Sequence, residues 1–290
     1  MKILVTGATG YIGAHVVKAL ALRGHEVHAT DYNTKQNDIF DYVEKQNFVP
    51  VDIRNNFGKC SSSKFDKIIH IAAKTKVPAS VKDPWDYYRT NVLGTKHVID
   101  GWDHDHFIYC STGSAFEPGS NPYAATKWGG ELITKQFCSK QSIVRFYNVS
   151  GNDGMHKFDD DVSHLIRKAA KVANKNNNHP IMPIYGTDYD TRDGTCIRNY
   201  THITDIVNSL VRIAENAPTG AIDCLGAPEG ISVREVIQCM KHVSGVNFRV
   251  EELDRREGDI AISTVPTKSK YFKQTKTLLH MCKDALRSEL

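Results

Sequence analysis

Short apolar runs alternate with helical patterns through the first half of the chain. Strands are predicted at 2–5, 26–31, 48–53, 67–73, 107–111 and 142–147. A helical spacing of apolar residues predicts helices at 11–23, 86–102 and 122–138, and Pro122 suits the first turn of the third. This regular alternation of strand and helix predicts an α/β fold built on a doubly wound parallel sheet.

The second half of the chain has a less regular pattern. Helices are predicted at 161–175, at 204–216 with Thr204 as the cap, and at 232–243, which opens with the capping-box pattern Ser232-Val233-Arg234-Glu235. Short strands are predicted near 184–186 and 197–200. We therefore expect a first domain at 1–150 and a smaller C-terminal α/β substrate-binding lobe at 151–290. Their boundary is soft, because strands of the lobe can join the main sheet. The tail after Lys270 is short and basic, which favours partial disorder.

A glycine-rich turn joins the first strand to the first helix. Gly7, Gly10 and Gly13 stand where a backbone can approach a pyrophosphate at a helix N-terminus. The second strand ends in Asp31, whose carboxylate can bind ribose hydroxyls and repel a 2′-phosphate. A strand before the turn, a helix after it and an acid at the next strand end together predict a Rossmann domain that binds NAD rather than NADP.

The segment Tyr123-Ala124-Ala125-Thr126-Lys127 carries the candidate chemistry. A tyrosine and a lysine at positions i and i+4 share one helix face. There the ammonium can lower the pKa of the phenol, so that the phenolate takes a proton from an alcohol near neutral pH. Thr112, at the end of a predicted strand, supplies a hydroxyl that can hydrogen-bond the reacting oxygen.

The candidate residues coincide with the carboxyl ends of the predicted strands. Ligands of doubly wound sheets gather at that edge. The positions that fall there are the Gly7 turn, Asp31, Asp52, Ala72, Thr112 and Asn148. We expect one ligand site along this edge.

Composition narrows the functional class. The 290 residues include 37 basic and 33 acidic side chains without a dense basic run, which does not favour nucleic-acid binding. No apolar stretch is long enough for a membrane span, and the N-terminus does not have the pattern of a signal peptide. Seven cysteines without a Cys-x-x-Cys pair favour reduced thiols in a cytoplasmic protein and no zinc site. The segment Asp103-His104-Asp105-His106 is interpreted as a solvated loop rather than a metal site.

From residue 1 to about 270, the chain resembles the extended short-chain dehydrogenase/reductase family, and most closely its UDP-hexose 4-epimerases. The opening Thr6-Gly7-Ala8-Thr9-Gly10-Tyr11-Ile12-Gly13 and the Tyr-x-x-x-Lys pair are shared by the broad family. The narrower likeness lies in the segment 184–202 and in Arg255-Arg256-Glu257-Gly258-Asp259, which resemble the nucleotide-sugar lobe of the epimerases.

The resemblance implies roles for individual residues. Tyr123 would be the general base, Lys127 its partner and a ligand of the nicotinamide ribose, and Thr112 the hydroxyl at the reacting oxygen. The implied NAD site comprises Gly7, Gly10, Tyr11, Ile12, Gly13, Asp31, Asp52, Ile53, Ile71, Ala72, Ala73, Asn91, Tyr123, Lys127 and Tyr147. The implied substrate site comprises Thr112, Asn148, Tyr185, Arg198, Arg256, Asp259 and Ser263.

The resemblance also implies a reaction and an assembly. Hydride would pass from C4 of a UDP-hexose to NAD and return to the opposite face of a 4-keto sugar. The serine at position 263 would leave room for an N-acetyl group, so N-acetylhexosamines are expected beside or instead of plain hexoses. Relatives pair through two long helices, which predicts a homodimer through 86–102 and 122–138.

Other activities remain open at this stage. A 4,6-dehydratase would place an acid pair directly after the active-site threonine, where Gly113 and Ser114 stand. A nucleotide-sugar reductase would release NAD(P) in every cycle. A non-catalytic NAD-binding sensor on the same fold would not need to keep the Tyr123–Lys127 pair.

Overall fold

The computed structural model divides into two compact units. The first comprises Met1–Phe146 and Val207–Cys224, and the second comprises Tyr147–Ile206 and Leu225–Leu290. The structure describes residues 1–33, 38–60, 63–153, 164–174, 181–227, 229–256, 259–266 and 269–289. The chain therefore returns once to the first unit, whereas the sequence predicted one soft boundary after residue 150.

A seven-stranded sheet lies at the centre of the first unit. Its strands are β1 (Lys2–Thr6), β2 (Glu26–Asp31), β3 (Phe48–Pro50), β4 (Phe65–His70), β5 (His104–Thr112), β6 (Gln141–Phe146) and β11 (Ile222–Leu225). Their order is β11-β6-β5-β4-β1-β2-β3. Every pair from β3 across to β6 is parallel.

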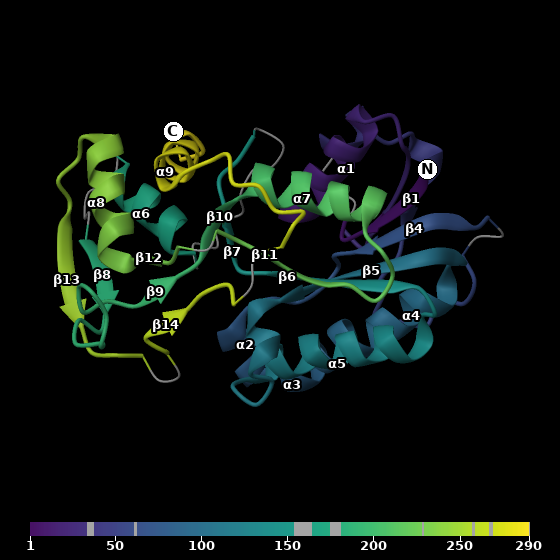
Figure 1. Cartoon of the computed structure of the whole chain (residues 1–290), viewed down its shortest axis with the longest axis horizontal. Coiled ribbons are helices and arrows are strands. Elements are labelled where there is room, and N and C mark those ends of the chain that lie inside the picture. The colour runs from purple at the N-terminus through teal and green to yellow at the C-terminus, as the bar shows by residue number, and fades with distance from the viewer. Residues whose placement is uncertain are drawn as a thin grey trace. The chain divides into compact units, whose positions relative to one another are not determined.

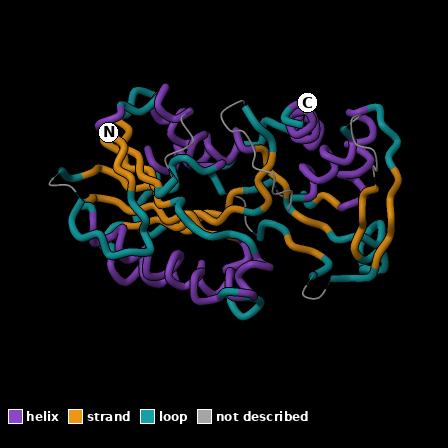
Figure 2. Tube along the Cα trace, turned by 180° about the vertical axis from the view of Figure 1, so that it is seen from behind, coloured by secondary structure: helices purple, strands orange, loops and turns teal. Residues whose placement is uncertain are grey.

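Helices cover both faces of this sheet. They are α1 (Tyr11–Leu22), α2 (Val77–Lys82), α3 (Pro84–Tyr88), α4 (Gly94–Gly101), α5 (Pro122–Phe137) and α7 (Ile203–Asn216). Helices α1 and α7 lie over one face, and α2 to α5 lie over the other (Figure 1). Figure 2 shows the orange strands between the two purple helical layers. This arrangement confirms the predicted doubly wound Rossmann-type fold.

The sheet is buried on both faces, which explains its continuous apolar runs. In β5, the residues Phe107, Ile108, Tyr109 and Cys110 are all 3 % exposed or less. Alternate residues of a strand face opposite sides, so a strand covered on both sides must be apolar throughout. On the face of α4, strand residues such as Leu4, Ile68, Phe107, Tyr109 and Ile143 pack with Val98 and Trp102.

In its described residues, the second unit consists of small sheets and three helices. Its strands are β7 (Asn148–Ser150), β8 (Ile181–Tyr185), β9 (Ile197–Arg198), β10 (Tyr200–His202), β12 (Ile231–Ser232), β13 (Arg249–Leu253) and β14 (Ile262–Ser263). They pair as β10-β7, β12-β9-β14 and β13-β8. The helices α6 (Leu165–Ala173), α8 (Val233–Ser244) and α9 (Leu278–Arg287) share one apolar core with β8, which includes Ile166, Met182, Ile237, Met240, Phe248 and Met281.

Strand β5 begins at His104, so the prediction of a solvated loop at 103–106 was wrong. His106 is buried, and its ring contacts Ser142 Oγ at 2.9 Å and Lys67 Nζ at 3.0 Å. These partners satisfy both ring nitrogens inside the sheet, which the polar sequence alone does not reveal. Asp103 and Asp105 pair with Lys59 and Lys64 at 2.8 and 2.5 Å.

The helix predicted at 86–102 consists of three segments. Asp83 caps α3, and Pro84 occupies its first position. A π-helical turn, Arg89–Leu93, then joins α3 to α4. Such turns are rare and often occur at functional sites. The turn contains Asn91, a residue of the predicted NAD site.

Two predictions in the second half of the chain need correction. Thr204 is not the cap of α7: the helix begins at Ile203, and the Thr204 amide donates to the ring of His202 at 3.1 Å. The tail after Lys270 forms α9, because its apolar face packs into the core of the second unit. The capping box at Ser232 and the first-turn position of Pro122 are confirmed.

Some predicted elements extend beyond the described part of the chain. The helix predicted at 161–175 is seen as α6, and residues 161–163 and 175 lie outside the described residues. Glu257 and Gly258, two of the residues that carried the resemblance, also lie outside them. Within the described ranges, no helix has both the length and the apolar character needed to cross a bilayer.

Candidate active site

The glycine turn after β1 leaves no room for side chains. Gly7 has a φ of +68°, and a Cβ on it would lie 2.7 Å from the Ala72 backbone nitrogen. A Cβ on Gly13 would lie 2.0 Å from the Gly7 carbonyl oxygen. The turn therefore packs tightly between α1 and the end of β4, and α1 begins directly after it at Tyr11. This backbone cradle at a helix N-terminus fits a dinucleotide pyrophosphate.

Asp31 ends β2 beside the glycine turn. Its carboxylate accepts hydrogen bonds from the Thr9 and Asn33 amides, each at 3.1 Å. The Thr9 hydroxyl also donates to the Asn33 carbonyl at 3.2 Å. These bonds fix the carboxylate at the edge of the turn, where a ribose bound next to the pyrophosphate would lie.

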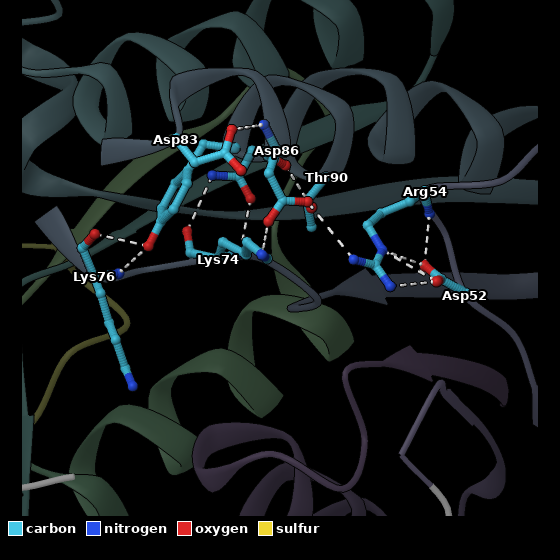
Figure 3. A network of polar contacts seen from close by, with 9 residues as sticks. Asp52, Arg54, Lys74, Lys76, Asp83, Asp86 and Thr90 are labelled. Atoms are coloured by element: carbon cyan, nitrogen blue, oxygen red, sulfur yellow. Dashed lines mark hydrogen bonds and ion pairs between the residues drawn. The ribbon is translucent and has the colours of Figure 1, made fainter. Parts of the chain in front are cut away.

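A network of charged side chains connects the ends of β3 and β4 with α3 (Figure 3). Arg54 binds both carboxylate oxygens of Asp52, with Nη2 to Oδ2 at 2.7 Å, and the hydrogen bond from Arg54 lowers the pKa of Asp52. Arg54 Nη1 also lies 3.6 Å from Asp86 Oδ1, and Lys74 pairs with the other oxygen of Asp86.

The network includes Asp52, one of the residues predicted for the NAD site. Its other charged members were not predicted from the sequence. Asp52 was predicted beside the adenine, and Ile53 next to it is buried. Arg54, Lys74 and Asp86 were not predicted. Oppositely charged residues at adjacent strand ends were the only available signal.

Asn91 connects the loop after β4 to α5. Its side-chain oxygen accepts from the Lys74 amide at 2.8 Å, and its Nδ2 donates to the Lys74 carbonyl at 3.0 Å. The same Nδ2 lies 3.1 Å from Thr126 Oγ1. The preceding residues Ile71 and Ala72 donate their amides to Thr6 Oγ1 at 3.2 and 3.3 Å. The predicted segment Ile71–Ala73 is thus held at the strand end from both sides.

Tyr123 lies in the first turn of α5. Asn121 caps this helix by accepting from the Ala124 amide at 2.9 Å, and the Tyr123 amide donates to Ser80 Oγ at 3.1 Å. Burial raises the pKa of the Tyr123 phenol, and a hydrogen bond with the Thr112 hydroxyl opposes that rise. The structure therefore brings Tyr123 and Thr112 together, as the sequence predicted.

Lys127 lies one turn further along α5 and is only 3 % exposed. Its Nζ donates to the Cys110 carbonyl at 2.7 Å and lies 4.3 Å from the centre of the Tyr109 ring. Burial lowers the pKa of this ammonium to about 8. The expectation of a phenol pKa below its ordinary value was wrong for this structure. The phenol is desolvated, and the ammonium makes its hydrogen bond to a backbone carbonyl.

His70 ends β4 next to these groups and is fully enclosed. Its Nδ1 contacts Thr6 Oγ1 at 2.7 Å, and its Nε2 contacts Thr95 Oγ1 at 3.1 Å. Burial lowers the pKa of its imidazole to about 3, and the nearby Lys127 adds to that shift. The histidine is therefore neutral and hydrogen-bonded on both sides.

Two arginines and an aspartate meet in the second unit. Arg256 Nε donates to Asp259 Oδ2 at 2.9 Å, and Arg198 Nη2 lies 3.7 Å from Asp259 Oδ1. The Arg256 guanidinium carbon is 4.7 Å from the centre of the Tyr185 ring, and Lys168 Nζ is 5.8 Å from it. Two cations at one aromatic ring, with Arg198 paired to the same aspartate as Arg256, suit a nucleoside diphosphate. The sequence reasoning missed Lys168, because only its helix and not its direction was predictable.

The remaining predicted substrate residues are placed by strand pairing in the same unit. Ser263 of β14 is the register partner of Arg198 in β9. Asn148 Nδ2 donates to the Asn199 carbonyl at 2.9 Å, next to Arg198. Tyr147 precedes β7 and is half-buried. The second unit thus holds the six predicted substrate residues on β7, β8, β9, β14 and the segment before β14, namely Asn148, Tyr185, Arg198, Arg256, Asp259 and Ser263.

Comparisons with known proteins agree with this geometry. Residues 3–223 match the model of the NAD dependent epimerase/dehydratase family. A UDP-glucose 4-epimerase from Halalkalibacterium halodurans is 32 % identical over 295 residues, which cover 90 % of this chain and 86 % of that protein. The chain therefore belongs to the NAD-dependent epimerase/dehydratase family, and it is an enzyme that uses NAD.

Solved structures share the fold over nearly the full length. The UDP-Glc/GlcNAc 4-epimerase from Campylobacter jejuni has a TM-score of 0.77 and 29 % identity, with 99 % of this chain and 98 % of that chain covered. The UDP-glucose 4-epimerase from Stenotrophomonas maltophila, solved with NAD and formylated UDP-arabinopyranose, has a TM-score of 0.87 and 25 % identity, with 100 % and 98 % covered. These likenesses support the Rossmann assignment of the first unit.

Proposed function

We propose that the chain catalyses the NAD-dependent 4-epimerisation of a UDP-hexose, interconverting UDP-glucose and UDP-galactose. The observation that carries the proposal is the placement of the Tyr123 phenol beside the Thr112 hydroxyl, one helical turn from the buried Lys127. The family match and the names of the relatives support the same activity.

The side chains of the first unit supply the acid–base chemistry. Bound NAD would supply the hydride acceptor and donor for C4 of the sugar, and the epimerisation would pass through a 4-keto sugar. The Tyr123 phenolate would accept the proton from the sugar O4 and later return it, and Thr112 would donate a hydrogen bond at the reacting oxygen. Burial disfavours this phenolate, and the positive charges of Lys127 and of the oxidised nicotinamide would favour it. Lys127 keeps a positive charge beside this site, because its pKa of about 8 leaves most of it protonated at pH 7.

The second unit would hold the nucleotide. Arg198 and Arg256 offer planar forks that match phosphate oxygens, and Asp259 can accept from ribose hydroxyls. In the structure both arginines pair with Asp259. Asp259 therefore holds the arginines in place until a bound diphosphate replaces it as one of their partners. Binding energy from the UDP part would retain the keto sugar while the hexose turns over.

The residues around Thr112 and Tyr123 argue against a dehydratase and against a non-catalytic sensor. A dehydratase needs an acid after the threonine, and the residues there are Gly113 and Ser114 in a short 3₁₀ turn. A reductase would consume reduced cofactor at every cycle. A non-catalytic sensor does not require a base, and the structure keeps Tyr123 and Thr112 in contact.

The decisive test is turnover without added cofactor. The purified protein should convert UDP-glucose to UDP-galactose and the reverse without added NAD, measured by separating the products. Tyr123→Phe should reduce kcat by about 10²–10⁴-fold, because the general base is lost. Tyr88→Phe, on the exposed side of α3, is the matched control. A wild type without turnover would restore the sensor interpretation, and unchanged turnover by Tyr123→Phe would mean that another residue is the base.

Sugar preference is a separate prediction about Ser263. We propose that its small side chain admits an N-acetyl group, so that UDP-N-acetylglucosamine is also epimerised. Ser263→Tyr should lose activity on the N-acetyl sugar and keep activity on UDP-glucose, whereas Ser263→Ala should keep both. A wild-type protein that converts UDP-glucose and ignores UDP-N-acetylglucosamine contradicts this proposal.

We also propose a homodimer through α3–α4 and α5. Large apolar side chains are exposed along these helices, including Trp85 at 62 %, Trp128 at 41 % and Leu132 at 43 %. Trp85 stacks on Tyr88 beside an open hollow of about 800 Å³, lined mainly by Pro84, both aromatics and the segment 118–122. Exposed apolar groups gathered in this way are typical of a protein interface.

A further inference from the structure

A buried ion pair lies one helical turn beyond Lys127. Glu131 of α5 is 1 % exposed and Arg145 of β6 is 7 % exposed. Arg145 Nε donates to Glu131 Oε1 at 2.8 Å, and Nη2 donates to Oε2 at 2.7 Å. This is a bidentate pairing, which fixes the guanidinium and the carboxylate in one plane.

Ser111 joins this pair from the strand that ends in Thr112. Its hydroxyl donates to Glu131 Oε1 at 2.6 Å. Ser111 and Arg145 are register partners in the parallel pairing of β5 and β6. Their side chains therefore leave the same face of the sheet and meet Glu131 where α5 crosses it. The helix that carries Tyr123 is thus bonded to the residue that precedes Thr112.

Arg145 also contacts the segment that follows Thr112. Its guanidinium carbon lies 4.1 Å from the centre of the Phe116 ring, in the 3₁₀ turn Gly113–Phe116. The ring faces a cation that Glu131 already orients, an arrangement with favourable electrostatics. Through Ser111 and Phe116, the pair therefore contacts both sides of Thr112.

Stability alone is a weak reason for such a pair. Moving two charges out of water costs several kcal/mol per ion, and a well-packed apolar pair is often equally stable. The hydrogen bonds of Glu131 instead lock the relative position of three elements. Two of these elements, β5 and α5, carry the groups proposed for proton transfer.

We propose that Ser111, Glu131 and Arg145 form a positioning triad that sets the distance and orientation of Thr112 relative to Tyr123 and Lys127. This inference rests on the proposed epimerase function for its kinetic consequence. The three residues act through their neighbours and do not touch the sugar.

The triad also acts on Lys127 through charge. The Glu131 carboxylate raises the pKa of the Lys127 ammonium and so opposes the lowering caused by burial. Without the carboxylate, the ammonium would lose its proton at a lower pH. This ionisation therefore reports the proximity of the Glu131 carboxylate to Lys127, and it can be measured without turnover.

The test compares stability, kinetics and ionisation in matched variants. Replacing both charged residues, Glu131→Met with Arg145→Met, should keep the urea midpoint near that of the wild type, because no buried charge is left unpaired. Its kcat for UDP-glucose should fall by about tenfold or more with little change in KM, as expected when transition-state positioning is lost. Glu131→Gln should move the alkaline limb of the kcat profile to lower pH. Glu215→Gln, which breaks the exposed pair with Arg23, is the control and should change neither kcat nor the alkaline limb of its pH profile.

A second readout does not depend on catalysis. The pH dependence of the unfolding free energy reports the Lys127 ionisation, and Glu131→Gln should move its onset to lower pH. If the wild type fails to epimerise UDP-glucose but this shift is seen, the proposed function fails and the triad stands. A double variant with normal stability and normal kcat overturns the positioning role. So does an unshifted onset in folded Glu131→Gln.

Discussion

At the scale of single residues, burial decides the ionisation of the candidate catalytic groups. Tyr123 and Lys127 are both desolvated, and desolvation disfavours the charged form of each. It raises the pKa of the phenol and lowers that of the ammonium to about 8. The sequence correctly indicated that Tyr123 and Lys127 would lie one turn apart on the same helix. The directions of their pKa shifts depend on burial and on the Cys110 carbonyl, which no local pattern encodes.

The Lys127 ionisation leads to a prediction about stability. Its pKa in the folded protein, about 8, lies below the value of 10.5 for an unburied lysine. Between these values the unfolded state binds more protons, so the free energy of unfolding should increase with pH across that window. Relative to Lys127→Met, the free energy of unfolding of the wild type should increase by about 3 kcal/mol from pH 8 to 10.5. Below pH 8 the difference between the two proteins should not change with pH.

Urea unfolding at a series of pH values, at equal NAD content, measures this difference. Lys96→Met, at a surface ion pair with Asp100, is the control for the loss of a lysine. A difference between wild type and Lys127→Met that does not vary with pH would show that Lys127 is not desolvated in the folded protein.

At the scale of elements, the sequence predicted what local chemistry determines. The glycine turn, Asp31 and the cap of α8 follow from short patterns of backbone geometry and hydrogen bonding, and the structure has them at the expected positions. The start of β5 and helix α9 were missed, because the partners that stabilise them are distant in sequence. His106 is stabilised by Lys67 and Ser142, and α9 by the core it shares with α8.

Helix α5 packs closely on β5, which leads to different predictions for the adjacent Gly129 and Gly130. A Cβ on Gly130 would lie 2.0 Å from the Tyr109 hydroxyl and 2.9 Å from the Asn91 carbonyl, whereas one on Gly129 would meet only Val92, at 3.0 Å or more. Gly130→Ala should therefore destabilise the protein by about 1–3 kcal/mol.

Gly129→Ala is the matched control. The alanine should stabilise the helix by up to about 1 kcal/mol through its higher helix propensity, and the Val92 side chain can move to make room for it. Denaturant midpoints of the two variants measure the contrast. Equal stabilities would mean that α5 does not approach β5 as closely as the structure has it.

At the scale of the whole molecule, the candidate residues divide between the two units. The first unit holds the dinucleotide turn and the Tyr123 group, and the second holds the arginines and Asp259. This division was predictable in outline, because the regular strand–helix alternation ends near residue 150. The return of Val207–Cys224 to the first unit was not predictable. The sequence of a short edge strand such as β11 does not indicate which strand it pairs with.

The exposed apolar surface of α5 leads to a prediction about the proposed dimer. Trp128 and Leu132 lie one turn apart on α5 and are both exposed, which leaves apolar surface that a second copy could cover. Introducing charge with Trp128→Glu and Leu132→Glu should convert a dimer into a monomer, because burying two unpaired carboxylates in an interface is strongly unfavourable. Light scattering at micromolar concentration measures the mass. Ile222→Glu, at an exposed apolar residue of β11, is the control and should remain dimeric. A wild type that is already monomeric at that concentration contradicts the assembly, and a dimeric double variant places the interface elsewhere.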